Sequence, residues 1–287
     1  MRFPVDSNAN PLPRTPGPGG YCIPPLRRRH VLHELRRFRG VFLSLTLREI
    51  AVRYRQALLG FAWALLQPVA LMLVTTLVFH GFLDVDSGGA PYSLFVLTGL
   101  VPWTFFHATV TSAVPSLVSN ADLVRKIYFP REAIPLASVG AGLLDLGAGL
   151  LLWLVLLLAY GLPLGVLMAW VPLLLVLLIV ATAAPALLGA AVNVYFRDVK
   201  HALPLLLQAL FFATPIIYRA DAVPAPWRGL LLLNPLTAVI EGLRAVALSG
   251  RAPPADTLLV GFAVAVVALV CAYWIFRRAS RRFADVV

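Results

Sequence analysis

Residues 164–192 read LGVLMAWVPLLLVLLIVATAAPALLGAAV and contain no charged side chain. A helix needs about 20 consecutive apolar residues to cross the hydrocarbon core of a bilayer, and this stretch is longer than that. The rest of the chain is similar, since hydrophobic residues make up 60% of it and charged residues only 13%. Soluble domains have about 45–50% apolar and about 25% charged residues. The composition therefore predicts an integral membrane protein and argues against a soluble enzyme or a free nucleic-acid-binding protein.

Six stretches are apolar and long enough, or nearly so, to span a membrane. They are 58–82, 92–118, 134–160, 164–192, 201–218 and 257–276. The fifth is short, and a second apolar piece, 223–240, follows it and is interrupted by prolines. We expect this part to form a span plus a re-entrant external hairpin, with two full spans as the alternative. The predicted fold class is an all-α integral membrane protein with six transmembrane helices.

The regions that flank the spans have their own composition. Residues 1–25 hold seven prolines and are expected to form a disordered tail. Residues 26–57 are basic and amphipathic, which is typical of an interfacial helix lying in the headgroup region; an ordinary soluble amphipathic helix is the alternative. The spans then form one transmembrane domain over 58–276, and residues 277–287 form a basic tail.

The distribution of positive charge predicts the orientation. Of the 24 Lys and Arg residues, only Arg219, Arg228, Arg244 and Arg251 fall outside the two terminal regions and the second and fourth loops. Lys and Arg accumulate on the cytoplasmic side of membrane proteins. We therefore expect both termini, residues 120–133 and residues 193–200 to be cytoplasmic, and six crossings between them.

The sequence has no pattern that indicates catalysis. It contains no GxxxxGK[ST] phosphate-binding loop, no HExxH and no CxxC, and its five histidines are scattered. Cys22 and Cys271 stand at opposite ends of the chain and form neither a disulfide framework nor a metal site. We expect no enzyme activity, no cofactor and no metal site in this chain.

Asp145 is the one acidic residue deep in a predicted span, near its middle. Ser138, Gly142 and Gly149 share its helix face by their spacing, and small residues let another helix approach closely. The face should therefore pack against protein and not lipid. Asp145 is either a site on a transport pathway or a buried, ion-paired packing residue; both interpretations remain open from the residues alone.

The second cytoplasmic loop, Asn120-Ala-Asp-Leu-Val-Arg-Lys-Ile-Tyr-Phe-Pro-Arg-Glu132, is unusually apolar for a loop. Asn120 can begin a short helix and Pro130 ends it. The predicted surface combines apolar and basic side chains, namely Leu123, Arg125, Lys126, Ile127 and Tyr128. It is either an elbow embedded in the headgroups or a docking helix for a cytoplasmic partner.

Aromatic residues gather near Pro102 and Pro215. Those singled out are Trp103, Phe106, Phe211 and Tyr218. Aromatic belts at the membrane interface explain many such residues. The alternative is that these four line a passage for sugars, because aromatic rings stack on the apolar faces of sugar rings.

Several segments together resemble the polysaccharide-export permeases of the ABC type-2 class. They are LREIAVRYRQALLG at 47–60 with Trp63 and Gln67-Pro68, GLVPWTFF at 99–106, Asn120 to Pro130, NVYFRDV at 193–199, TPIIY at 214–218 and Asn234-Pro-Leu236. The resemblance covers about residues 40–280. The Pro-rich start has no counterpart in the family pattern.

The resemblance implies a homodimer of six-span permeases, each bound to a cytoplasmic ATPase subunit that holds the ATP and Mg. It implies a lipid-linked glycan as substrate, of the O-antigen, capsule or teichoic-acid type, exported across the bacterial inner membrane. The segment 120–130 would be the coupling helix, 223–240 the re-entrant gate and 42–56 the interfacial helix. Arg48, Arg53 and Arg55 would contact the lipid diphosphate, or else anchor the chain to anionic headgroups.

Three other functions remain as alternatives. The chain could be a type-2 permease for a drug or a small lipid, an integral membrane enzyme of lipid-linked sugar metabolism, or a secondary transporter driven through Asp145. The enzyme predicts turnover by this chain alone, and the secondary transporter predicts dependence on the proton gradient.

Overall fold

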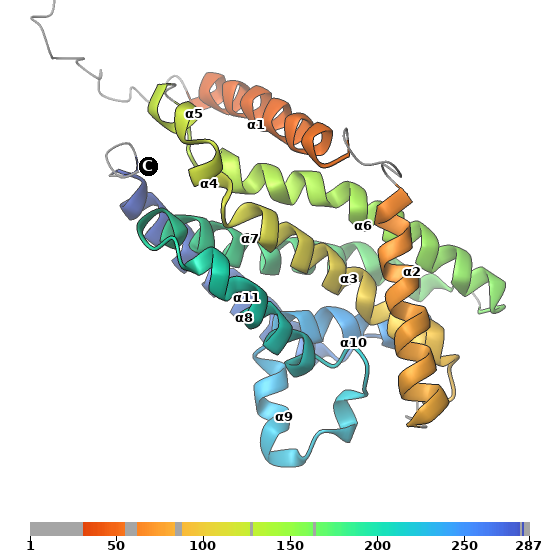
Figure 1. Ribbon diagram of the computed structural model, residues 1–287. Helices are drawn as coiled ribbons and strands as arrows, with labels where there is room; N and C mark the ends of the chain where they lie inside the picture. Colours follow the sequence, from red (N-terminus) through yellow and green to blue (C-terminus); the bar gives the residue numbers. More distant parts are fainter. Residues whose placement is uncertain are drawn as a thin grey trace, which may run out of the picture. The chain divides into compact units, whose positions relative to one another are not determined.

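The computed structural model describes residues 31–54, 62–83, 88–126, 129–162, 165–281 and 283. Contacts divide the chain after Arg37, and the unit from Phe38 to Val287 contains every element except the first residues of α1. All the regular elements in the described ranges are helices, which confirms the all-α prediction (Figure 1). The predicted Pro-rich tail, residues 1–25, lies outside these ranges.

Within the described ranges, five helices are long and apolar enough to cross a membrane. They are α2 (Trp63–Thr75) continued by the π-helical η3 (Thr76–Phe82), α3 (Tyr92–Ala113), α6 (Ala133–Ala159), α7 (Val171–Tyr195) preceded by the 3-10 helix η4 (Val166–Trp170), and α11 (Ala255–Ser280). A bent pair, Pro226–Leu232 and Pro235–Ala247, brings the number to six if it counts as one span. The two parts of this pair meet at 91°, the geometry of a broken span or a re-entrant loop.

The fifth predicted stretch, 201–218, is only partly helical. Helix α8 (Val199–Ala213) has 15 residues, which is shorter than a span requires. It ends because Thr214 precedes Pro215, and a residue before proline avoids the helical conformation; Thr214 has extended backbone, with φ −99° and ψ 136°. Residues after Tyr218 form η5 (Ala220–Ala222) and α9 (Ala225–Leu232) before α10 (Pro235–Ala247) begins.

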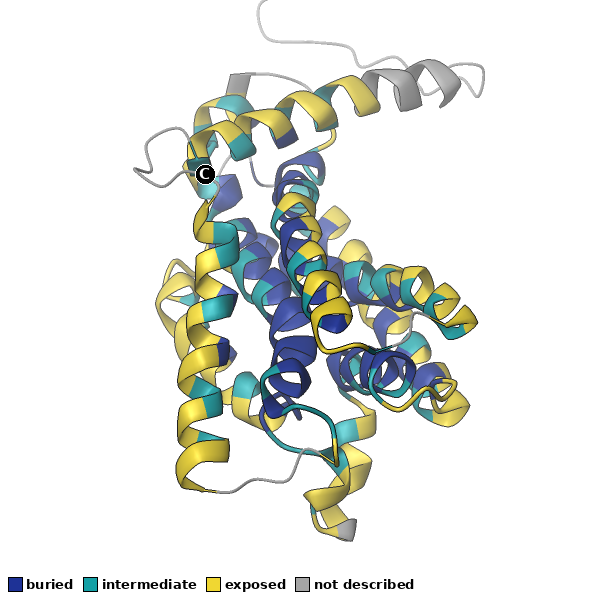
Figure 2. Ribbon diagram, turned by 90° about the vertical axis from the view of Figure 1, so that its right-hand side faces the viewer, coloured by how far each residue is buried: buried dark blue, intermediate teal, exposed yellow. Residues whose placement is uncertain are grey.

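Helix α3 is the centre of the bundle. In its most apolar window 78% of residues are buried, against 17% for α2 with η3 and 22% for α11. Figure 2 shows the dark blue, buried helices in the middle and exposed faces on the helices around them. The exposed side chains of α2 and α11 are themselves apolar, for example Leu73 and Val267. Such surfaces are stable where lipid covers them, so the outer helices behave as lipid-facing spans.

Hydrogen bonds identify the segments that meet at each end of the bundle. At one end, the Arg131 side chain donates to the carbonyl of Ser280, and the Tyr195 hydroxyl donates to that of Ala279 over 3.0 Å. This end also carries α4 (Ser116–Ser119) and α5 (Ala121–Lys126), and we call it the α5 end (Figure 1). At the opposite end, which we call the α9 end, the Tyr92 hydroxyl donates to the Ile217 carbonyl over 2.8 Å. The loops predicted to be cytoplasmic therefore gather at one end.

Helix α1 (Val31–Tyr54) covers most of the predicted interfacial region. Its second half lies across the α5 end of the bundle in Figure 2. It approaches α6 closely, since a methyl group added at Gly140 would stand 2.9 Å from the Thr46 hydroxyl oxygen. The helix itself is confirmed, and its placement in the headgroup region stays a prediction.

Candidate functional site

The predicted docking segment begins at Asn120, which joins α4 to α5. The amide nitrogen of the Asn120 side chain donates to the Ser116 carbonyl over 2.8 Å, and its oxygen accepts from Arg48 over 3.2 Å. The backbone carbonyl of Asn120 accepts from the amides of Leu123 and Val124. Asn120 therefore stabilises the bend between α4 and α5 and also contacts α1.

A second apolar cluster supports this segment. Val124 of α5 is 3% exposed and packs in a group with side chains from α4, α6, α7 and the end of α11. The largest members are Phe276 and Phe283, whose rings meet edge to face with centroids 5.5 Å apart. Burying Val124 leaves Leu123 partly exposed and Arg125 exposed at the surface. Ala121 and Phe129 also pack against this cluster, so several apolar side chains hold the segment on the bundle, while Arg125 faces outward.

Only part of the predicted docking surface can be placed. Asn120, Leu123 and Arg125 lie as just described, and Ile127 and Tyr128 lie outside the described residues. The side chain of Lys126 is also outside them, although its backbone completes α5. The role of this surface stays a prediction.

Two of the three arginines predicted to contact a lipid diphosphate lie in the described residues, and they bind different protein groups. Arg48 donates to Asn120, and Arg53 forms an ion pair with Asp145 of α6 and a 3.2 Å hydrogen bond to the Ser112 hydroxyl of α3. Arg55 lies outside the described residues. The guanidinium of Arg53 is thus engaged with protein groups from two helices.

The ion pair gives Asp145 the partner that the sequence did not reveal. The two side chains are 22% and 18% exposed, so the pair is mostly covered. The predicted small-residue face beside Asp145 packs on α3, as expected. A methyl group added at Gly142 would stand 2.3 Å from the Thr109 hydroxyl oxygen, and one at Gly149 would stand 3.1 Å from a Val101 methyl carbon. The one available sequence signal was that an acid in an apolar span requires a cation, and α1 is a nearby basic segment.

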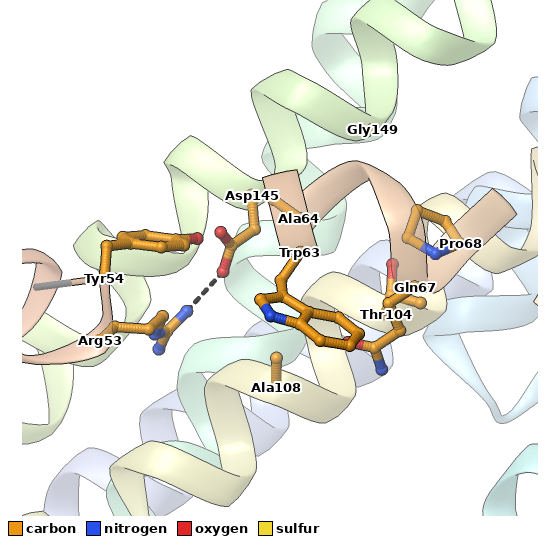
Figure 3. Close-up of a pocket in the computed structure, with 10 residues that line it drawn as sticks. All are labelled: Arg53, Tyr54, Trp63, Ala64, Gln67, Pro68, Thr104, Ala108, Asp145 and Gly149. Carbon is orange, nitrogen blue, oxygen red and sulfur yellow. Dashed lines mark hydrogen bonds and ion pairs between the residues drawn. The ribbon is translucent and has the colours of Figure 1, made fainter. Parts of the chain in front are cut away.

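A cavity of about 280 Å³ lies beside this pair, where α1, α2, α3 and α6 meet (Figure 3). Its walls are Arg53, Tyr54, Trp63, Ala64, Gln67, Pro68, Thr104, Ala108, Asp145 and Gly149. Figure 3 shows Arg53 and Asp145 facing each other on one side, with the Trp63 ring between them and Gln67. The predicted sequence motifs included Trp63 and Gln67, but nothing in the sequence indicated that they share a cavity with Asp145.

Three of the four predicted passage aromatics lie together. The Trp103 ring centroid is 5.7 Å from that of Phe106 and 5.4 Å from that of Phe211, across the contact of α3 with α8. Trp103 and Phe106 are each 5% exposed, so in a single chain they fill this contact and do not face an open channel. Tyr218 lies nearer the α9 end, where its hydroxyl donates to the Phe212 carbonyl over 2.9 Å. The lining role stays a prediction, and it requires α8 to move away from α3.

Arg244 of α10 is a buried structural residue, although its position in the sequence predicts only one of the few charges on the outer side. It is 5% exposed, and its guanidinium donates to the carbonyls of Pro215 and Ile216, each over 2.6 Å. The same group lies 3.6 Å above the centre of the Phe95 ring and contacts Glu241 at 3.0 Å. Carbonyls of an irregular segment need internal donors at membrane depth, and Arg244 supplies them to the TPIIY segment.

Asn234 provides a second attachment for that segment. Its side-chain oxygen accepts from the Leu236 amide over 3.0 Å and so caps α10, while its side-chain nitrogen donates to the Thr214 hydroxyl over 2.9 Å. Pro235 follows at the first helical position, where proline is favoured. Asn234 and Pro235 therefore start α10 after the break, and the bond to Thr214 connects this break to the end of α8.

Comparisons with known proteins cover most of the chain. Residues 40–248 match the family model described as ABC-2 type transporter. The chain is 34% identical over 257 residues to the O-antigen export system permease protein RfbA of Myxococcus xanthus, which covers 89% of this chain and 98% of that protein. It is 26% identical over 248 residues to the protein of the same name from Klebsiella pneumoniae, covering 86% and 95%. It is also 26% identical over 216 residues to the polysialic acid transport protein KpsM of Escherichia coli, covering 72% and 81%.

Proposed function

This chain belongs to the ABC-2 type transporter family, and on that premise we propose that it is the permease subunit of an exporter for a lipid-linked polysaccharide. Family membership makes the chain a multi-pass membrane permease and not an enzyme, and it implies a separate ATPase subunit. The proposed substrate class is supported by the names of the relatives of this chain. One set is named for O-antigen export and another for polysialic acid transport, and both of these are polysaccharides.

The proposal includes an assembly and an orientation. Two copies of this chain form the passage in the bacterial inner membrane, and ATP and Mg bind to the partner subunits. The α5 end faces the cytoplasm, together with both termini. The distribution of charge supports this orientation, since Arg48, Arg125, Arg131 and Arg197 belong to segments of the α5 end.

The α4–α5 segment is the proposed docking site for the ATPase. Leu123 and Arg125 present mixed apolar and basic groups beside the buried anchor Val124. Apolar groups buried in a partner's groove contribute roughly 25 cal/mol per Å². The basic groups would set the register by meeting acidic groups of the partner.

Docking is tested by co-purification. Ile127→Asp should release the ATPase and stop export while the permease still inserts, because it places a charge in the proposed contact. Ser249→Asp adds the same charge at an exposed turn after α10 and is the matched control. It should change neither ATPase binding nor export. A full complement of ATPase on the Ile127→Asp protein would favour the alternative, an elbow embedded in the headgroups.

The substrate class is tested by removing the gene and following surface glycan. Loss of this chain should leave lipid-linked polysaccharide inside the cell and remove it from the surface, and the wild-type gene should restore it. A permease for a drug or small lipid predicts unchanged surface glycan, and that result would exclude the proposed substrate.

A further inference from the structure

The cavity between α1, α2, α3 and α6 has no role in the docking just described. Its volume, about 280 Å³, lies just below the lower end of the range of about 300–1,000 Å³ that is typical of sites for drug-sized molecules. It therefore accommodates about one small ring. Ala64, Ala108 and Gly149 form parts of its wall and leave room at their positions.

The charges of the cavity cancel. Arg53 and Asp145 pair directly, and they are the only oppositely charged side chains among its described lining residues. An anion such as a diphosphate would have to displace the Asp145 carboxylate, which would then lose its partner in a mostly covered position. The cavity therefore favours a neutral ligand over an anionic one.

The polar groups that remain are suited to hydroxyls. Asp145 uses one carboxylate oxygen for Arg53, and its other oxygen, Oδ1, has no hydrogen-bond partner among the described residues. Gln67 adds an amide that both donates and accepts. Thr104 donates its hydroxyl hydrogen to the Val101 carbonyl over 3.0 Å, so its oxygen remains an acceptor. Oδ1 is itself buried, so binding a sugar hydroxyl requires the Asp145 carboxylate to rotate, and this terminal torsion is soft.

The apolar surface of the cavity is an aromatic face. Trp63 is 51% exposed, and Figure 3 places its ring beside the ion pair and Gln67. A half-exposed indole next to hydroxyl-binding groups matches the two-sided chemistry of a pyranose ring, which has an apolar face and a rim of hydroxyls. A purely apolar ligand would leave Asp145 Oδ1 without a donor, and such a buried group is costly.

We propose that this cavity binds one sugar ring of the transported glycan, with Trp63 against the apolar face of the ring and with Asp145 and Gln67 bonded to its hydroxyls. The proposal rests on the proposed function, because it names a subsite for that substrate. Arg53 is a positioning residue here, since it holds the Asp145 carboxylate through the ion pair.

The test measures protection of a cysteine in the cavity wall. Ala108→Cys is placed in a chain whose native cysteines are replaced, Cys22→Ser and Cys271→Ser, and the full-length permease with its ATPase is reconstituted in lipid nanodiscs. A small water-soluble methanethiosulfonate then reacts with the new thiol. The probes are the methyl glycosides of glucose, galactose, mannose, rhamnose and N-acetylglucosamine, with inorganic pyrophosphate as a separate arm.

At least one methyl glycoside should protect the thiol, and pyrophosphate should not. A sugar at about ten times its Kd slows labelling roughly tenfold, because only the empty cavity reacts. Trp63→Ala should reduce the protection to about twofold, since loss of the ring contact weakens binding about tenfold, and Trp63→Phe should retain most of it. Trp227→Ala is the matched control, because Trp227 is an exposed indole of α9 outside the cavity. Ser249→Cys, in the same background, should show no protection.

The other outcomes overturn the proposal. Protection by pyrophosphate equal to or above that by sugars would make the cavity an anion site. Protection by no glycoside would mean that lipid or a packing contact fills the space. The export assay on wild-type protein separates this failure from that of the proposed function: glycan on the surface without thiol protection refutes only the subsite, and absence of glycan export refutes the function itself.

Discussion

The ion pair between Arg53 and Asp145 connects α1 to the bundle, and its energy can be measured by a double-mutant cycle. The variants are Arg53→Gln, Asp145→Asn and both together. Asp145→Asn keeps the shape of the side chain, so the effect of removing charge is separated from that of creating a void. The pair joins residues 92 positions apart, and Ser112 adds a third helix to the contact.

The exposed fractions set the expected size of the effect. Exposed ion pairs contribute about 0.2–1 kcal/mol, and removing one partner of a fully buried pair costs about 3–5 kcal/mol. The two side chains are 22% and 18% exposed, so the pair lies between these limits and nearer the buried one. Each single substitution should lower the free energy of unfolding by about 2–3 kcal/mol, and the coupling energy should be about 1–2 kcal/mol.

The free energies are measured by reversible unfolding of the purified permease in mixed micelles with increasing dodecyl sulfate. Arg219 and Asp221 provide the matched control, since they form an ion pair at the α9 end with 38% and 60% exposed side chains. The hydrogen bond from Arg219 lowers the pKa of the Asp221 carboxyl below its ordinary value, so this carboxyl is charged at neutral pH. The coupling energy of this control pair should stay under about 1 kcal/mol.

Additive single effects at Arg53 and Asp145, within about 0.5 kcal/mol, would refute the reasoning, because uncoupled residues do not form the pair. The same variants have a functional readout. Asp145→Asn should still assemble with the ATPase and should lower export only in part. Complete loss of export from a fully assembled Asp145→Asn complex would mean that transport requires the negative charge itself and not only the hydrogen bonds of this side chain.

Three further predictions concern packing, the TPIIY segment and orientation. Gly142→Ala should lower the free energy of unfolding by about 1–3 kcal/mol, because the added methyl group meets Thr109 and Phe105. Gly147→Ala is the control and should be nearly neutral, because no atom lies within 4 Å of its added methyl group. Equal effects of the two substitutions in the same unfolding assay would contradict the close packing of α6 on α3. Arg244→Met should lower the free energy of unfolding by at least about 2 kcal/mol and expose residues 214–218 to proteolysis, because the carbonyls of Pro215 and Ile216 lose their hydrogen-bond donor. An unchanged protease pattern would mean that Arg244 does not hold this segment. In intact cells, an impermeant thiol reagent should label Arg251→Cys and not Lys200→Cys, and the reverse pattern would invert the proposed orientation.

The general architecture of this chain follows from its sequence. Long apolar runs require lipid as solvent, and the unequal distribution of Lys and Arg predicts which loops gather at one end. The small residues around Asp145 predict that its helix face meets another helix, and Gly142 and Gly149 do pack on α3. These properties depend on the local spacing and the average chemistry of each segment, so periodicity and composition are sufficient to recognise them.

The partners of the polar groups were decided by the tertiary structure. Asp145 requires a cation, but the choice of Arg53 depends on how α1 returns across α6, which no local pattern encodes. The sequence alone predicts Arg244 as an exposed charge of a loop. In the fold it is buried, where it donates hydrogen bonds to carbonyls of the irregular TPIIY segment. The cavity arises from four helices whose contributing residues range from Arg53 to Gly149. Hydrophobicity determines that each helix is buried in lipid or protein, and only the packed arrangement determines which side chains then meet.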